Sequence, residues 1–436
     1  MAFHSSVLDR DADSPAQAAP LPVAGLATVV FLGVTAGVQM SDRGLQSILS
    51  PAIKASFGVG DAVMGALHGI AGILVASALA VPLARLADRH SRKSILLALI
   101  AAWTALTALG ALAPNFPLFF LGRAASGITE FAMIPIVYSL IPDLVGERWR
   151  VASNLAFAAL MATGASAGFY LGGHLLAWAT VLGSDAAPPG IEPWRLCMLM
   201  LSAAGLPLLL LGLATLDPPR LALRADDGAV GESLAAFVRA RRRQILLFFG
   251  TAGGLAIAVQ ATTPMIAMAI VRRYGADLAQ VGHTLGLITL LTSLGSLPLA
   301  GALDKGLRQR FSERARPVVM GLATAMSIPC IGALAVATGE QASLWLVGGF
   351  LLSTCIANAL IPTLLQDIAP VTLRARCFAA YSFLIAIFCA AGPVLSGAIS
   401  QFLLGDDLLL AIAAAAVPVL CIALLCAVLS TVTTRA

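Results

Sequence analysis

Long apolar stretches recur along this chain, and short polar stretches separate them. A helix rises about 1.5 Å per residue, so about 20 apolar residues cross a bilayer core about 30 Å thick. The pattern therefore predicts an all-α membrane protein with twelve transmembrane helices. The predicted spans are 21–40, 62–83, 94–113, 118–141, 154–180, 196–216, 245–271, 281–303, 318–338, 344–365, 377–404 and 408–432.

Composition and charge support a multi-pass membrane protein. Hydrophobic residues make up 59% of the chain and charged residues only 11%, against about 25% charged in soluble proteins. Of the 27 lysines and arginines, 21 fall on one face of the predicted topology. Because basic residues concentrate on the cytoplasmic side, we expect both termini in the cytoplasm and the protein in the plasma (inner) membrane. The net charge of +5 reflects this asymmetry and does not indicate nucleic acid.

The chain divides into two similar halves. Residues 1–20 predict a disordered cytoplasmic tail, and residues 217–243 predict a cytoplasmic linker between bundles of six helices at 21–216 and 244–432. The segment after the second helix, with Asp88, resembles the segment after the eighth, with Asp304, 216 positions later. Two parallel six-helix pseudo-repeats are the architecture in which a central site alternates its exposure.

Four charges mark the predicted membrane helices: Asp42 and Arg43 at the far end of the first, and Arg123 and Glu130 inside the fourth. A charge in hydrocarbon costs several kcal/mol, so such residues mostly pair, line cavities or carry ions. Counting along each helix predicts Asp42 and Arg123 at similar heights toward the outer leaflet. Glu130 follows Arg123 by two helical turns on the same face, which predicts a proton-accepting carboxylate near an arginine and makes Glu130 and Asp42 the proton-coupling candidates.

A structural interpretation of these charges stays open. Asp42 or Arg43 can extend to the outer surface, and Arg123 and Glu130 can form a static pair. Arg43 points about 100° away from Asp42, as adjacent helical residues do, so it need not share the same face.

Residues 84–93, ARLADRHSRK, follow the second helix. They resemble the loop signature of the major facilitator superfamily, G-x-L-A-D-R-x-G-R-K, with Ala84 and Ser91 replacing glycines. We expect a carboxylate here to latch onto the positive end of a neighbouring helix, although the charges could also serve topology alone. The gating candidates are Asp88, Arg89, Arg92, Arg148 and Asp304.

Asp42-Arg43 with Pro51, Arg123-x-x-x-Gly127-x-x-Glu130, and Asp217-Pro218-Pro219-Arg220 resemble the Spinster-like branch of that superfamily. The resemblance is strong over residues 40–220 and weaker in the second half; Thr129 stands where the branch usually has glycine. It implies a proton-linked carrier of lysophospholipids or sphingoid phosphates. It also implies that the substrate-binding residues, for a charged headgroup and protons, are Asp42, Arg43, Arg123 and Glu130.

The second half agrees with an amphipathic substrate, because its helices offer hydrogen-bonding groups such as Gln260, Asn358 and Tyr381 rather than clear mid-membrane charges. The leading hypothesis is a proton-coupled secondary transporter of an amphipathic anionic or zwitterionic lysophospholipid-like solute, acting as a monomer in the bilayer. One alternative is a proton-coupled organic-anion or sugar-acid symporter, and another is a non-transporting lipid receptor. The seven cysteines have no metal-site or disulfide spacing, and no enzyme or nucleotide motif is present, so we expect no cofactor.

Overall fold

The structure is a computed structural model that describes residues 22–75, 77–78, 90–185, 191–217, 234–370 and 373–433. Its regular elements there are helical, which confirms the predicted all-α fold. Eleven helices are long and apolar enough to cross a membrane, and a shorter apolar helix at Asp61–Val75 occupies the place of the predicted second span. Residues 76 and 79–83 of that span and the tail at 1–20 lie outside the described residues.

The N-terminal half contains seven α-helices and one π-helical segment among its described residues. They are α1 (Pro22–Phe57), α2 (Asp61–Ala66), η1 (Leu67–Val75), α4 (Arg92–Ala111), α5 (Phe116–Leu144), α6 (Glu147–Asp185), α7 (Pro193–Ala203) and α8 (Gly205–Leu213).

The C-terminal half follows with the elements α9 (Leu234–Ala240), α10 (Arg242–Thr262), α11 (Ile266–Tyr274), α12 (Leu278–Phe311), η2 (Ser312–Arg314), α13 (Ala315–Gly332), η3 (Ala333–Val336), α14 (Glu340–Ile368), α15 (Arg374–Leu403) and α16 (Leu408–Thr433). The helix α9 lies within the predicted linker, most of which falls outside the described residues. The domain bounds 21–216 and 244–432 stay predictions.

The first helix differs from its prediction. The apolar run 21–40 predicted that Asp42 and Arg43 stand at its far end, but α1 continues to Phe57 without a break. The helix continues because Asp42 is buried and paired, so the charged pair does not end it. Asp42 and Arg43 therefore lie well inside the helix.

Glycines hold α1 against α6. A Cβ atom on Gly164 would lie 2.1 Å from the carbonyl oxygen of Gly37, and one on Gly168 would lie 2.0 Å from the carbonyl oxygen of Ser41. Any larger residue would force the two backbones apart, because small residues permit this close approach of membrane helices. This contact fixes the rotation of α1 and thereby directs Asp42 and Arg43 toward α5.

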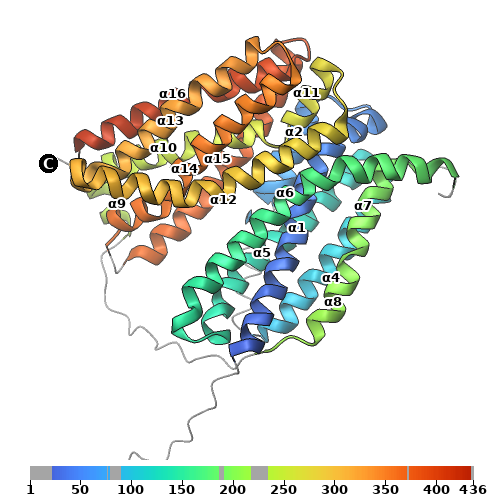
Figure 1. Ribbon diagram of the computed structural model, residues 1–436, viewed down its shortest axis with the longest axis horizontal. Helices are drawn as coiled ribbons and strands as arrows, with labels where there is room; N and C mark the ends of the chain where they lie inside the picture. Colours follow the sequence, from blue (N-terminus) through green and yellow to red (C-terminus); the bar gives the residue numbers. More distant parts are fainter. Residues whose placement is uncertain are drawn as a thin grey trace, which may run out of the picture.

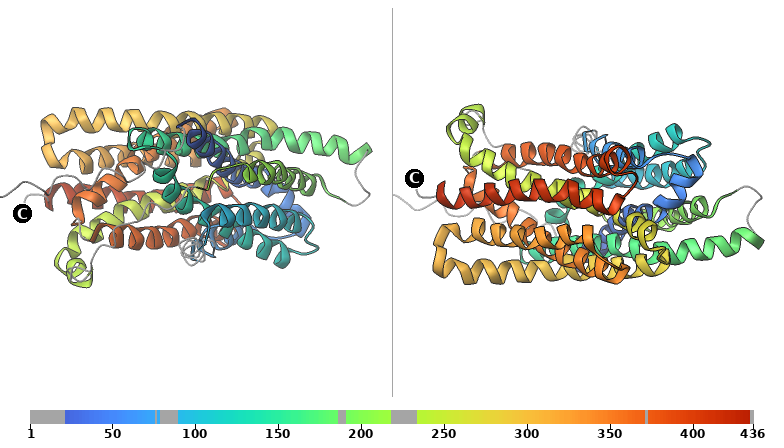
Figure 2. Two further views of the ribbon diagram at one scale, coloured as in Figure 1. Left: turned by 90° about the horizontal axis from the view of Figure 1, so that it is seen from below. Right: turned by 90° about the horizontal axis from the view of Figure 1, so that it is seen from above.

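The two groups of helices meet at one end of the molecule and diverge toward the other (Figure 1). Contacts between them run from α1 to α11, from α6 to α12, and from α2 and η1 to α15. Both views of Figure 2 show most of the N-terminal helices, in blue to green, toward one end of the long axis and most of the C-terminal helices, in yellow to red, toward the other. In the predicted topology the joined ends face outward, and the diverging ends face the cytoplasm.

Candidate transport site

Two ion pairs, one buried and one partly buried, join α1 to α5 inside the N-terminal half. Arg123 donates to the carboxylate of Asp42 over 2.6 Å, and Arg43 Nε donates to Glu130 Oε2 over 3.3 Å. Asp42, Arg123 and Glu130 are buried. The structure thus brings together all four charges that the sequence singled out.

The partners differ from the sequence-based interpretation. Helical spacing suggested that Arg123 serves Glu130, but Arg123 contacts Asp42, and Glu130 contacts Arg43 instead. A helix period shows which residues of one helix share a face, and it does not fix how two helices rotate against each other. The surface position considered for Asp42 is wrong, because only 1% of its area is exposed.

This core cluster, defined as Asp42, Arg43, Arg123 and Glu130, keeps unused hydrogen-bonding capacity. Glu130 Oε1, Arg43 Nη2 and Arg123 Nε are buried, and none has a hydrogen-bond partner among the described residues. A buried polar atom without a partner costs free energy, so such atoms in a native structure require an explanation. An anionic ligand could accept hydrogen bonds from the two arginine nitrogens, and a proton could bind to the carboxylate.

Arg43 is the most accessible member of the core cluster. Its side chain is 34% exposed, and its guanidinium lies 4.4 Å from the centroid of the Phe131 ring. An arginine over an aromatic ring keeps donors free for a planar anionic group. Arg43 can therefore meet a headgroup while it still contacts Glu130.

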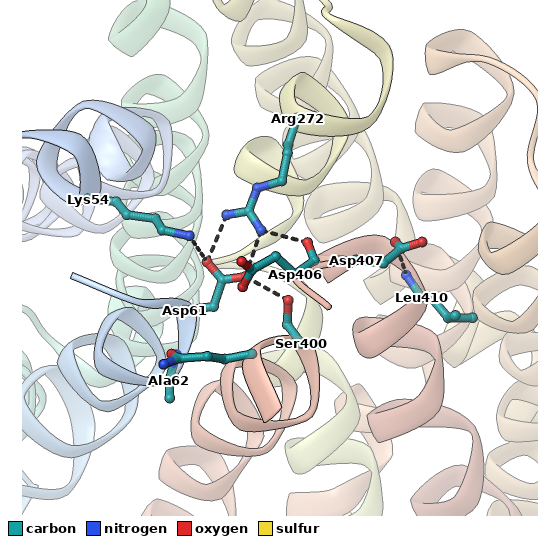
Figure 3. Close-up of polar contacts among 9 residues, drawn as sticks. Lys54, Asp61, Ala62, Arg272, Ser400, Asp406, Asp407 and Leu410 are labelled. Carbon is teal, nitrogen blue, oxygen red and sulfur yellow. Dashed lines mark hydrogen bonds and ion pairs between the residues drawn. The ribbon is translucent and has the colours of Figure 1, made fainter. Parts of the chain in front are cut away.

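A second charged network lies where the two groups of helices meet, at the ends that face outward in the predicted topology. We call it the outer network. Asp61 begins α2 and accepts hydrogen bonds from Lys54 of α1, Arg272 of α11 and Ser400 of α15 (Figure 3). Among the described residues, the Arg272–Asp61 contact is the one ion pair that joins the two halves. Sequence reasoning missed this network. Its signal was that Lys54 and Arg272 are basic residues on the predicted outer face, where such residues are rare.

The gating candidates pair within their own halves where the structure describes them. Arg92 contacts the carboxylate of Asp143 and the carbonyl of Ser139, and Asp304 contacts Arg308 and Arg316. Arg148 is exposed and lies 5.6 Å from the ring centroid of Trp149. Asp88 and Arg89 lie outside the described residues. The gating roles stay predictions.

The sequence matches a family of known transporters. The sequence model of the Major Facilitator Superfamily matches residues 31–393. The chain belongs to the Major Facilitator Superfamily. Members of this superfamily are transporters, so this assignment supports a multi-pass membrane transporter.

Individual relatives agree with this family. The chain is 26% identical over 390 residues to an MFS-type efflux pump of Mycolicibacterium smegmatis, covering 87% of this chain and 85% of the relative. It is 31% identical over 158 residues, 34% of this chain and 37% of the relative, to the uncharacterized MFS-type transporter YwfA of Bacillus subtilis.

Solved structures share the fold. A bacterial homologue of the human lysosomal transporter Spinster, in its inward-facing and unoccupied conformation, matches with a TM-score of 0.78 and 18% identity over 94% of this chain and 96% of that chain. The nucleoside transporter NupG matches with a TM-score of 0.67 and 14% identity over 94% and 99%. At these identities the likeness concerns the fold alone.

Proposed function

We propose that this protein is a Spinster-like, proton-coupled secondary transporter that moves an amphipathic lysophospholipid or sphingoid-phosphate-like solute by alternating access. The observation that carries the proposal is the core cluster. There Glu130 keeps one carboxylate oxygen without a partner among the described residues, beside Arg43, whose side chain is 34% exposed. We expect a monomer in the inner membrane with both termini in the cytoplasm.

Competition for Arg43 provides a coupling mechanism. When Glu130 is ionised, its carboxylate holds Arg43 through one hydrogen bond of 3.3 Å. Protonation of Glu130 removes the negative charge, weakens that contact and frees the guanidinium for a phosphate group. Substrate release followed by loss of the proton restores the pair, so proton and anion occupancy become linked.

The surroundings of Arg43 suit an amphipathic anion. Phe131 provides an aromatic surface on one side, and the helices of the opposite half are largely apolar with scattered hydroxyl and amide groups. Binding sites for such ligands combine an apolar lining with a few polar groups that fix the orientation. The headgroup would meet Arg43, and Arg123, which holds Asp42, would add a second contact through its Nε, which has no hydrogen-bond partner among the described residues.

The test is proton-gradient-driven uptake into liposomes by Glu130→Gln, with lysophospholipids, sphingoid phosphates and sugar acids as substrates. We expect gradient-driven uptake to collapse while substrate exchange without a gradient partly survives. Glu147→Gln, at an exposed position at the start of α6, is the matched control. Unchanged pH-dependent uptake by Glu130→Gln would remove this residue from the coupling role.

The same assay separates the other candidates. Uptake of sugar acids alone would favour the organic-anion symporter, and binding without flux would favour a lipid receptor. A relative that covers 87% of this chain is an efflux pump, and this observation favours outward movement of the solute as the direction to test first.

A further inference from the structure

Asp61 is the most completely partnered carboxylate that the structure describes. Its side chain is fully buried, and four hydrogen bonds reach its two oxygens. Lys54 and Arg272 Nη2 donate to Oδ1 over 2.5 and 2.7 Å, whereas Arg272 Nη1 and Ser400 donate to Oδ2 over 2.7 and 2.6 Å. Figure 3 shows these partners converging on Asp61 from separate helices.

The partners divide between the two halves of the protein. Lys54 belongs to α1, in the same half as Asp61, whereas Arg272 and Ser400 belong to α11 and α15 in the other half. Arg272 also donates to the carbonyl oxygen of Asp406, at the outer end of its own half, over 2.8 Å. Separation of the outer ends would therefore carry Arg272 and Ser400 away and leave Lys54 with Asp61.

We propose that Lys54 and Arg272 act in opposite directions on the outer gate. Arg272 is the clasp that holds the outer face closed, and Lys54 is the retained counter-ion that allows it to open. A carboxylate without any partner is strongly unfavourable in a poorly solvated site. Because Lys54 stays with Asp61 in either arrangement, opening the gate does not leave that charge unpaired.

The neighbouring charges do not take over these roles. Arg273, the next residue of α11, contacts the carboxylate of Asp407, and both residues belong to the C-terminal half. Separation of the halves therefore leaves that ion pair intact. Arg273 is therefore a matched control for Arg272, with the same charge, the same helix and a partner that moves with it.

The inference rests on the alternating-access part of the proposed function and is independent of the solute and of proton coupling. Its test is hydrogen exchange measured by mass spectrometry on the full-length protein in nanodiscs, without substrate or gradient. The reporter segments are 61–66 and 266–275. The first includes the amide of Ala62, which donates to Gln401 across the two halves over 2.9 Å. Hydrogen exchange detects rarely populated open states.

Arg272→Gln is expected to speed exchange in the reporter segments by about tenfold or more, a typical size for conformational coupling. Lys54→Gln is expected to slow exchange by a comparable factor, because opening would then expose an uncompensated carboxylate. Arg273→Gln is expected to leave exchange unchanged. Faster exchange in Lys54→Gln would show that Lys54 is merely another clasp and would overturn the proposal.

Asp61→Asn gives a second test that depends on the carboxylate itself. With no charge at position 61, adding Lys54→Gln should change exchange in segment 266–275 no further. If Lys54→Gln still slowed exchange in the Asp61→Asn background, the proposal would also be overturned.

If Lys54→Gln fails to fold, Lys54→Arg, which keeps the charge, should fold and open like the unmodified protein. Faster or slower opening of Lys54→Arg by tenfold would contradict a role based on charge.

Discussion

The core cluster and the outer network around Asp61 both bury charge, but they differ in how fully that charge is satisfied. Glu130 receives one hydrogen bond of 3.3 Å and leaves its second oxygen without a partner among the described residues. Asp61 receives four hydrogen bonds of 2.5–2.7 Å. The core ion pairs lie within one half, whereas the partners of Asp61 come from both.

This difference indicates different tasks. Incomplete hydrogen bonding leaves a site able to gain a ligand or a proton, because the gain removes an existing cost. Complete hydrogen bonding across an interface instead stabilises the arrangement that brings the partners together. The core cluster is thus suited to binding, and the outer network is suited to holding a conformation.

The largest effect is expected for Arg123→Ala, which leaves Asp42 buried without its partner. Breaking a buried ion pair in this way costs about 3–5 kcal/mol of the free energy of unfolding, and substrate binding should weaken severely. Denaturation in detergent and ligand binding measure the two effects. The double variant Asp42→Asn/Arg123→Gln should recover most of the stability and none of the transport. An intact substrate affinity in Arg123→Ala would show that Arg123 serves structure alone.

Arg43→Gln should weaken headgroup binding more than it lowers the stability of the fold. Arg43 is 34% exposed and has one long hydrogen bond to Glu130. Because Gln can still donate to that carboxylate, we expect a smaller loss of stability than in Arg123→Ala. Loss of a charged hydrogen bond to a headgroup costs about 1.5–3 kcal/mol, which corresponds to roughly 10- to 150-fold in Kd. Binding of a lysophospholipid measures this, with the exposed Arg310 changed to Gln as the control. Equal affinities in both variants would exclude Arg43 from the headgroup site.

Ser400→Ala tests the outer network with a smaller change. Ser400 donates to Asp61 over 2.6 Å, whereas Ser396, one turn earlier on α15, is equally buried and donates to the carbonyl of Pro393 in its own helix. Ser400→Ala should cost the closed outer face about 1–2 kcal/mol and speed hydrogen exchange there. Ser396→Ala should not. The same exchange in both variants would contradict a specific role for Ser400.

The smallest effect is expected at Glu192, just before α7. Burial raises the pKa of Glu192, but hydrogen bonds from Ser56, Arg195 and Trp194 outweigh it, so the pKa lies below its usual value. A lowered pKa in the folded state stabilises the protein above the unfolded pKa, and this contribution is lost as the pH falls through the folded pKa.

Glu192→Gln should therefore lower the Tm slightly at pH 7, and the difference should disappear in acid. The effect is small because the side chain is 44% exposed and such surface pairs contribute about 0–1 kcal/mol. Thermal unfolding at several pH values measures it, with Glu340→Gln at the outer start of α14 as the control. A difference that grows in acid would have the wrong sign.

The sequence predicted much of the candidate site but not its pairing. Helical counting predicted similar heights for Asp42 and Arg123, and the structure brings them into contact. The same counting did not predict that Arg43 faces the site, but Arg43 is the partner of Glu130 in the structure. The apolar count also ended the first helix near residue 40, because hydropathy alone does not show that a charged pair is buried and paired inside a longer helix.

The few basic residues on the predicted outer face could have pointed to the outer network. Of the basic residues assigned to the outer face, Lys54, Arg195, Arg272 and Arg273 each contact a carboxylate in the structure. Basic residues are disfavoured on that face, so each exception was a sign of a specific partner. Lys54 and Arg195 meet carboxylates nearby in sequence, whereas the partners of Arg272 and Arg273 lie more than 130 residues away.

The sequence by itself determined that this is a helical membrane protein of two related halves, because helix length and hydrophobicity follow from local composition. It also singled out the four charges of the core cluster. Only the tertiary structure decided which carboxylate each arginine meets and that Asp61 joins the halves. The physical reason is that helix rotation and separation depend on packing between distant segments, such as Gly37 against Gly164, and the period of a single helix does not contain that information.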